Sequence, residues 1–137
     1  MWPRVKGMRA LELGSVGAMR ERLNSLVLAG EKLATTGLFE EYRTETEGLE
    51  YVGEQLALLD NSGEWTATVE ITGVEVTSFG EVTWAHAAAE GEGDASLAEW
   101  RAGHQRFWAE GGTPVEDGTA VVCLTFRLVE TAAPAAG

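Results

Sequence analysis

The chain has 137 residues, 45% of them hydrophobic and 23% charged, and its formal net charge is −12. This length and composition fit one globular domain that needs no disulfide or metal for stability. No apolar run reaches the ~18 residues of a membrane-spanning helix, and the single cysteine, Cys123, forms no internal disulfide. The N-terminal residues lack the apolar core of a secretory signal, so we expect a cytoplasmic protein with no membrane partner.

The charge is distributed unevenly along the chain. The first 43 residues carry seven of the ten Lys and Arg residues against five acidic ones, and the remainder carries three against seventeen. Tight binding to duplex DNA needs many phosphate contacts, which so acidic a surface opposes. We therefore expect no duplex DNA partner, and instead a small nucleoside-like ligand or a short single-stranded RNA. The sequence does not predict an oligomeric state.

The N-terminal part of the chain predicts two helices. Residues 1–14 have no clear period and are predicted to be an N-terminal extension. Apolar residues recur at helical spacing over residues 15–29, which predicts a helix capped by Ser15 and ended by Gly30 in the left-handed conformation. A short second helix is expected around residues 38–44.

The middle of the chain predicts two strands. Residues 51–60 and 64–72 are each rich in residues that favour strands, and residues 61–63 between them form a turn. Apolar and polar residues alternate strictly along the second strand, but the alternation changes phase after Gly73. A change of phase without loss of the strand predicts a β-bulge at this glycine.

The C-terminal part predicts a helix and a long strand. Residues 96–109 form a helix that starts with a capping box of Ser96 and Glu99. Its inward stripe consists of Leu97, Trp100, His104, Phe107 and Trp108. Residues 119–129 are a final strand, and residues 131–137 are predicted to be a disordered tail. Strands around two helices, with a bulge, predict an α+β domain built on a small, bent β-barrel.

The sequence has no metal-binding, nucleotide-binding or serine-hydrolase motif, so no metal and no cofactor is expected.

Two polar features could carry chemistry. Lys32 lies three residues before Thr35, and a lysine that loses its proton could activate a hydroxyl or a water; the alternative is a solvated lysine beside a turn. Glu90, Glu92 and Asp94 crowd before a helix, where repulsion could make one of them an acid or base; the alternative is an ordinary acidic loop.

The third feature is aromatic. Trp100, His104, Phe107 and Trp108 could stack a nucleobase. Their helical spacing, however, favours packing in the core. Of the four, His104 is the side chain most able to reach a pocket instead.

Four segments of the chain, in order, resemble the ASCH domain family. They are LAGEKLAT, VGEQLALLDNSGEW, EVTWAHAAAEGEGDASLAEWRAGHQRFW and VVCLTFRLVE, and the similarity covers about residues 15–130. The most specific pieces are the G-x-K-x-x-T at residues 30–35 and the EGEGD-x-SL-x-x-W at residues 90–100. The resemblance implies a domain over residues 15–130 with a PUA-like fold, in which helices flank a cleft on a small β-barrel.

The resemblance also implies an activity. Activities in the family include hydrolysis of the acetyl amide of N4-acetylcytidine, as well as ribonuclease activity. The amidohydrolases use a lysine, a threonine three residues later and a distant glutamate, which Lys32, Thr35 and Glu90 match here, with Glu92 as the alternative glutamate. The small amidohydrolases carry an arginine two residues after the threonine, where this chain has Gly37.

We therefore predict an amidohydrolase that acts on an N-acylated pyrimidine nucleoside, with Lys32, Thr35 and Glu90 as its catalytic residues. The predicted binding residues are Thr36, Glu92, Arg101 and His104. Two alternatives stay open. The chain could be a non-catalytic module that binds RNA or a modified nucleoside, or it could be a ribonuclease that uses Lys32, Glu90 and His104.

Overall fold

The computed structural model describes residues 2–45 and 47–132. This part of the chain forms one six-stranded sheet with the strand order β1-β2-β4-β5-β6-β3. The strands are β1 (Arg4–Val5), β2 (Met8–Leu11), β3 (Ala34–Leu38), β4 (Gln55–Leu59), β5 (Trp65–Ser78) and β6 (Ala120–Thr131). The helices are α1 (Ala18–Leu28), α2 (Phe39–Arg43), α3 (Trp84–Ala89) and α4 (Leu97–Glu110), with a 3-10 turn, η1 (Phe79–Glu81).

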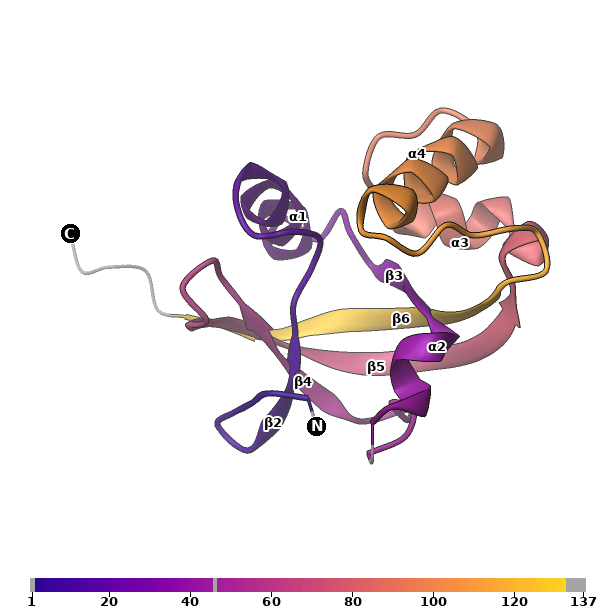
Figure 1. Cartoon of the computed structure of the whole chain (residues 1–137). Coiled ribbons are helices and arrows are strands. Elements are labelled where there is room, and N and C mark those ends of the chain that lie inside the picture. Colours follow the sequence, from indigo (N-terminus) through magenta and orange to yellow (C-terminus); the bar gives the residue numbers. More distant parts are fainter. Residues whose placement is uncertain (1, 46, 133–137) are drawn as a thin grey trace.

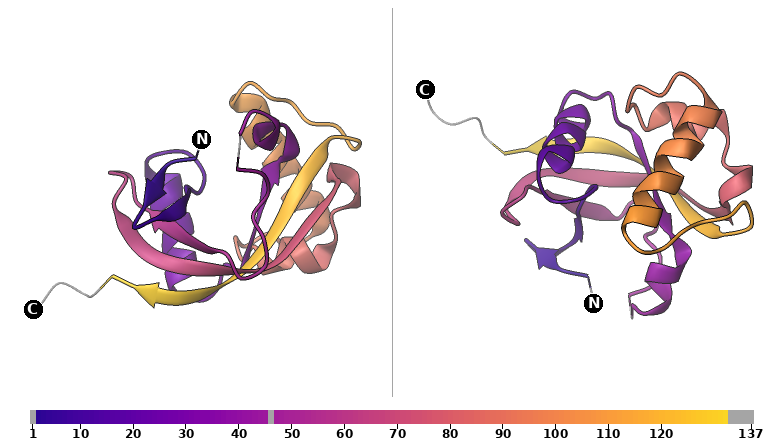
Figure 2. Two further views of the ribbon diagram at one scale, coloured as in Figure 1. Left: turned by 90° about the horizontal axis from the view of Figure 1, so that it is seen from below. Right: turned by 45° about the horizontal axis from the view of Figure 1, so that its top comes forward.

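The sheet is curled but does not close. β2 pairs with β4 in parallel, and the other pairings are antiparallel. No ladder of hydrogen bonds joins β1 to β3 in the described residues, so these two strands remain edges. Figure 2 shows the sheet from below as an open trough. The α+β class is confirmed, whereas a closed barrel is not.

β5 and β6 are the longest strands, and a bulge bends them. The register shifts between Ile71 and Gly73, which leaves Thr72 as an extra residue. Ile71 and Val74 therefore pack in the same hydrophobic cluster. A Cβ atom at Gly73 would lie 2.6 Å from the Thr125 hydroxyl, so glycine is needed for this close approach. The predicted bulge is confirmed.

β6 is buried on both of its faces because successive strand residues point in opposite directions. Val122, Leu124 and Phe126 pack in one core with Leu23 and Val27 of α1. Val121 and Cys123 pack in a second core with Phe79, Trp100 and Trp108. In Figure 1, α1 lies on one side of β3, and α3 and α4 lie on the other. β3 thus runs between the two cores.

The start of α1 differs from the prediction and its end does not. Gly17, not Ser15, is the N-cap residue, and no side-chain cap is present there. The Asn61 side chain accepts a hydrogen bond from the Gly17 N–H and donates one to its carbonyl oxygen, so a distant residue fixes this helix start. Gly30 follows the helix with a φ of 76°, the predicted left-handed conformation.

Other expected elements are present with changed boundaries. α2 lies in the predicted segment, and Ser96 caps α4 by accepting from the Glu99 N–H at 3.2 Å. β4 covers only the second half of residues 51–60, because the first half forms a turn. The strands β1, β2 and β3 and the helix α3 were not predicted. None of the helices in the described ranges combines the length and apolar character that crossing a bilayer requires.

Only the first two residues of the predicted disordered tail, 131 and 132, lie within the described part of the chain. Thr131 belongs to β6, and the Ala132 N–H donates to the carbonyl oxygen of Thr66 at 2.8 Å. Residues 133–137 of that tail lie outside the described residues.

Candidate functional site

The segment after α1 lies directly against the segment after α3. The Leu33 N–H donates a hydrogen bond to the Ala89 carbonyl oxygen at 2.8 Å. Gly91 has a φ of 66°, and a Cβ atom there would collide with the carbonyl oxygen of Glu31. Only glycine therefore allows the acidic loop to approach the backbone beside Lys32 so closely.

Lys32 is buried beneath this contact, with 1% of its surface exposed. Its ammonium group donates to the Ala34 carbonyl oxygen and to Glu92 Oε2, both at 2.8 Å, and lies 3.4 Å from Glu90 Oε1. Two carboxylates thus lie beside this buried ammonium group and pair with it. The geometry supports a fixed cation here rather than a neutral amine that acts as a base.

Glu90 is the centre of the hydrogen-bond network. Its Oε2 accepts from the Thr36 hydroxyl at 2.7 Å and from the Trp100 indole N–H at 2.9 Å. Burial alone would raise the pKa of Glu90, but His104, His86 and the neighbouring lysine hold this pKa well below its usual value. Glu90 is 1% exposed and remains an anion that organises its neighbours.

His86 reaches the network from α3. Its Nε2 lies 2.8 Å from the Thr36 hydroxyl oxygen. Because this hydroxyl donates its proton to Glu90, the His86 Nε2 carries a proton and donates it to Thr36. Burial lowers the pKa of His86, but the sulfur of Cys123 and the carboxylate of Glu90 outweigh burial and raise it to about 9.

His104 approaches Glu90 from α4. Its Nδ1 is 2.9 Å from the Trp100 carbonyl oxygen, and its Nε2 is 3.4 Å from Glu90 Oε1. The His104 ring stacks on the Trp100 indole with a centroid distance of 4.1 Å. Burial lowers the pKa of His104, but the hydrogen bond to Glu90 and its charge raise it overall. The aromatic contact also favours the cationic form.

Glu92 is the accessible acid of the site. Its side chain is 17% exposed, against 1% for Glu90. Burial raises the pKa of Glu92 although the ammonium group of Lys32 opposes this, and the carboxylate of Glu90 raises the pKa further. Glu92 is therefore the carboxyl group that most readily exchanges a proton with a bound molecule.

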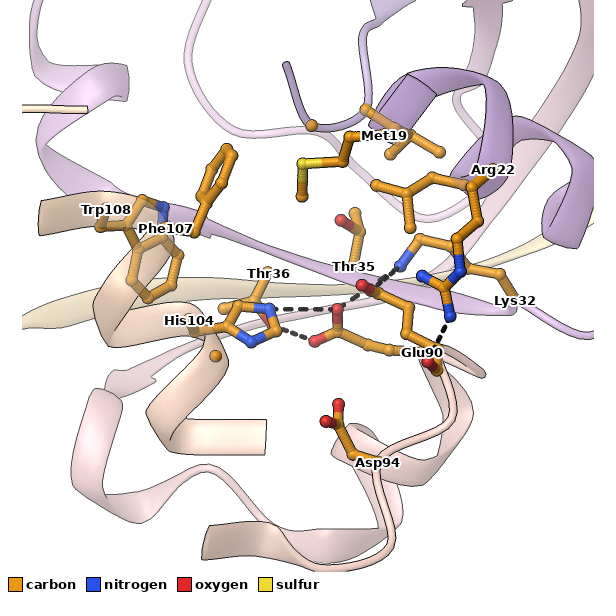
Figure 3. A pocket seen from close by; sticks show the side chains of 15 residues that line it. Met19, Arg22, Lys32, Thr35, Thr36, Glu90, Asp94, His104, Phe107 and Trp108 are labelled. Atoms are coloured by element: carbon orange, nitrogen blue, oxygen red, sulfur yellow. Dashed lines mark hydrogen bonds and ion pairs between the residues drawn. The ribbon is translucent and has the colours of Figure 1, made fainter. Parts of the chain in front are cut away.

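Of these polar groups, Lys32, Glu90, Glu92 and His104 line a cavity of about 280 Å³. Figure 3 shows Thr35 between an apolar wall, which includes Met19 and Phe107, and the charged groups of Lys32 and Glu90. The lining residues are Leu13, Gly14, Met19, Arg22, Leu23, Lys32, Thr35, Thr36, Glu90, Glu92, Asp94, Gly103, His104, Phe107 and Trp108. The cavity thus offers a hydroxyl, a buried cation, a protonatable carboxyl group and an aromatic surface.

Three of these side chains also have the donor atoms of a metal site. One ligand atom each from Glu90, Glu92 and His104 lies within 4.8 Å of the others. The ammonium group of Lys32 contacts both carboxylates, so a cation is already supplied at this point. A metal ion would have to displace Lys32 to bind between them.

The structure brings six of the seven predicted site residues together. The cavity is lined by Lys32, Thr35, Thr36, Glu90, Glu92 and His104. Arg101 does not line it, because its guanidinium group donates to the Gly80 carbonyl oxygen and ties α4 to η1. The predicted binding role of Arg101 therefore finds no support in the geometry.

Two members of the network were not predicted as site residues. Trp100 was assigned to the core, yet its indole N–H binds Glu90. His86 lies four residues before Glu90, a spacing that places both on one face of a helix. The helix could have been predicted from Thr83, whose hydroxyl accepts a hydrogen bond from the His86 N–H and caps the start of α3.

The fold and the cavity together define a class: a curled α+β domain with a charged cleft between two helical layers. The ASCH domain family matches residues 10–130, and the chain belongs to this family. It is similar to the crystal structure of a protein from Enterococcus faecalis V583, with 29% identity, a TM-score of 0.77, and coverage of 88% of this chain and 75% of the other.

Two further crystal structures have the same fold. An ASCH domain from Lactobacillus crispatus JV V101 is 29% identical, with a TM-score of 0.75 and coverage of 88% of this chain and 79% of that one. A hypothetical protein is 21% identical, with a TM-score of 0.58 and coverage of 80% and 93%, which shows the fold alone. None of the curated proteins matches the chain.

Proposed function

We propose that this ASCH domain protein is an amidohydrolase that removes an acyl group from the exocyclic amine of a pyrimidine nucleoside. The observation that carries the proposal is the 2.8 Å ion pair of Lys32 and Glu92 in the wall of the cavity that Thr35 also lines. Hydrolysis of an amide needs a nucleophile, a group that stabilises the oxyanion and an acid for the leaving nitrogen. These three side chains supply the three groups.

In the proposed reaction, the Thr35 hydroxyl positions a water that attacks the carbonyl carbon, or it attacks this carbon itself and forms an ester that a water then hydrolyses. Glu92 takes the proton from the nucleophile and returns it to the leaving amine. A raised pKa suits a group that must both accept and donate a proton near neutral pH. Glu90 is less suited to this role, because its neighbours hold it as an anion.

Lys32 stabilises the negative charge that develops on the carbonyl oxygen. All three N–H groups of its ammonium already have acceptors. The contact to Glu90 is the longest of the three, at 3.4 Å, and is the one that the carbonyl oxygen of a substrate can replace. A buried, preorganised ammonium group is effective because water does not screen it. Glu90 holds Lys32 and Thr36 in place and acts through them.

The walls of the cavity support a pyrimidine as the leaving group. Met19, Phe107 and Trp108 offer an apolar surface for a flat ring, opposite the polar side chains. A phosphate group fits less well, because Glu90, Glu92 and Asp94 line the cavity and two of its three basic side chains, Lys32 and His104, are already paired with these carboxylates. The charge balance therefore favours hydrolysis of a small amide over a ribonuclease.

The proposal is tested by incubating the purified protein with a panel of N4-acylated cytidines and following cytidine release by chromatography. We expect turnover that Thr35→Val abolishes and that Lys32→Met lowers by about 10²–10³-fold. Lys6→Ala, at an exposed lysine outside the cavity, should leave turnover unchanged. If cytidine derivatives bind but no acyl group is released, the protein is a binding module and the proposed activity is wrong.

A further inference from the structure

A second hollow, of about 180 Å³, adjoins the first. The two share Leu13, Gly14, Thr35, Thr36 and Trp108, so they are two arms of one cleft that meet at Thr35. We propose that the second hollow, here called the acyl arm, receives the acyl group of the substrate and selects a positively charged one, such as an aminoacyl group. This inference rests on the proposed function.

The position of Glu92 decides which part of a substrate enters which arm. When an amide is hydrolysed, the nitrogen leaves as an amine and must receive a proton. Glu92 lines the first cavity and does not line the acyl arm. The leaving nucleoside therefore occupies the first cavity. The acyl substituent, on the other side of the carbonyl carbon at Thr35, points into the acyl arm.

The acyl arm is larger than an acetyl group requires. Its volume of about 180 Å³ compares with the ~10–15 Å³ that, on the same measure, holds one water-sized group such as a methyl. Gly37 lines the arm, and a Cβ atom built there would meet no other atom within 4 Å. Gly37 shares its strand face with Thr35, since side chains two residues apart point the same way. Several atoms beyond a methyl group can be accommodated.

The polar wall of the acyl arm is acidic. Glu12, Glu41 and Glu50 line it, and no lysine or arginine of the described residues does. Two of the three carboxylates have partners. Glu12 pairs with Arg20 at 3.6 Å, and Glu50 accepts from the Tyr42 hydroxyl at 2.7 Å.

Glu41 is different from these two. In the described part of the chain its carboxylate has neither a hydrogen-bond nor an ion-pair partner; the residue lies at the exposed edge of the arm, and partial burial raises its pKa. It lies on α2 beside Tyr42, whose ring makes an edge contact with Trp2. A carboxylate without a partner, next to aromatic rings and a vacant volume, fits an ammonium group on the ligand.

The proposed reaction balances with water alone. The hydroxyl of water bonds to the carbonyl carbon, the bond between this carbon and the exocyclic nitrogen breaks, and a proton goes to the nitrogen. The products are an amino acid and a nucleoside with a free amine. No oxidant, reductant or further substrate is needed.

A binding experiment tests the acyl arm independently of turnover. N4-(3-aminopropyl)cytidine and its neutral isostere N4-butylcytidine contain no amide, and their affinities can be compared by isothermal titration calorimetry. We expect the amine to bind about tenfold more tightly than the butyl compound, because one charge-assisted hydrogen bond contributes about that much affinity. Glu41→Gln should reduce the ratio to about one, since it removes the charge and keeps the shape.

Glu40→Gln is the matched control. Glu40 precedes Glu41 on the same helix and is exposed like it, but Glu40 pairs with Arg43 and does not line the arm. This variant should keep the tenfold preference. Equal affinities in the parent protein, no binding of either compound, or a preference that survives Glu41→Gln would each overturn the proposal.

A parallel assay separates this inference from the proposed function. N4-glycylcytidine and N4-propionylcytidine differ only in an ammonium group in place of a methyl group. We expect the glycyl compound to be hydrolysed with the higher kcat/KM. If neither amide is cleaved while the amine analogue keeps its binding preference, the hydrolase function is wrong but the cation-selective arm stands. If both amides are cleaved equally, the arm is wrong and the hydrolase stands.

Discussion

Lys32 and Glu92 form a 2.8 Å ion pair although sixty positions separate them in the chain. The lysine is almost fully buried, whereas the carboxylate reaches the cavity. The same ion pair thus joins a fixed charge to an accessible acid. Most of the predicted chemistry depends on this asymmetry.

Replacing Lys32 should impair both activity and stability. In Lys32→Met, the carboxylates of Glu90 and Glu92 lose their shared cation, which for a buried pair costs about 3–5 kcal/mol of unfolding free energy. The loss of a preorganised charge should lower kcat by about 10²–10³-fold. Thermal melts and initial rates measure the two effects. A variant that melts like the parent protein would contradict the burial of the lysine.

The two glutamates should respond differently to substitution. Glu92→Gln should lower kcat by about 10²-fold or more with little change in melting temperature, because it removes the proton carrier and keeps the shape. Glu90→Gln should lower the melting temperature markedly, because three hydrogen-bond donors and two histidines lose the anion that they contact. The reverse pattern would identify Glu90 as the acid, as the family resemblance implies.

The local elements were the predictable part of this structure. The bulge at Gly73 followed from the phase of alternation, and the cap at Ser96 followed from its spacing to Glu99, since both signals are local. The strand β2 was missed because its four residues, Met8–Leu11, carry a charge and too few alternations to show a period.

The site was predictable only in part. The resemblance identified Lys32 and Glu90, but periodicity cannot show that two loops meet. Their contact depends on Gly91, whose requirement is visible only once the Glu31 carbonyl oxygen is seen beside it. Arg101 was misplaced because helical spacing does not show whether a long side chain folds toward a cavity or toward a neighbouring turn.

Stability should fall as the pH rises from about 6.5 to 9. The pKa of His86 is raised from 6.5 to about 9 in the fold, so its contribution is fully present below 6.5 and is lost as the pH passes 9. Glu92, whose pKa is raised from 4.5, also destabilises the fold as the pH rises, but its contribution begins to be lost above pH 4.5. Melting temperatures between pH 6 and 9.5 test this. His86→Gln should flatten the profile, and an unchanged slope would exclude His86 as its source.

Below pH 4.5 the sign reverses. The pKa of Glu90 is held well below its ordinary value of 4.5, so its contribution is present above 4.5 and is lost as acid protonates the folded protein. Chemical denaturation at pH 3 and pH 6 should therefore show lower stability at pH 3. Glu90→Gln should remove much of this difference.

Filling the acyl arm should change substrate size selection without harming the fold. In Gly37→Val, the new side chain enters the volume beside Thr35, and β-branched residues are favoured in strands. Hydrolysis of N4-acetylcytidine should persist, while kcat/KM for a bulky acyl group should fall by about tenfold or more. Equal losses for both substrates would place the acyl group elsewhere.

The acidic loop should be displaced by a single methyl group at Gly91. In Gly91→Ala, the new Cβ meets the carbonyl oxygen of Glu31, which is backbone and cannot yield without moving the segment that carries Lys32. The positive φ adds about 1–2 kcal/mol of strain. Gly112→Ala is the control, because Gly112 also has a positive φ, 90°, but its Cβ would meet nothing within 4 Å.

The difference between these two variants isolates the contact from the strain. Gly112→Ala should lose only the strain energy and keep full activity. Gly91→Ala should lose more unfolding free energy and most of its activity, because Glu90 and Glu92 follow the loop away from Lys32. Denaturant unfolding and initial rates measure both. If the two alanine variants were equally stable and equally active, the close approach of the loops would not be what assembles the site.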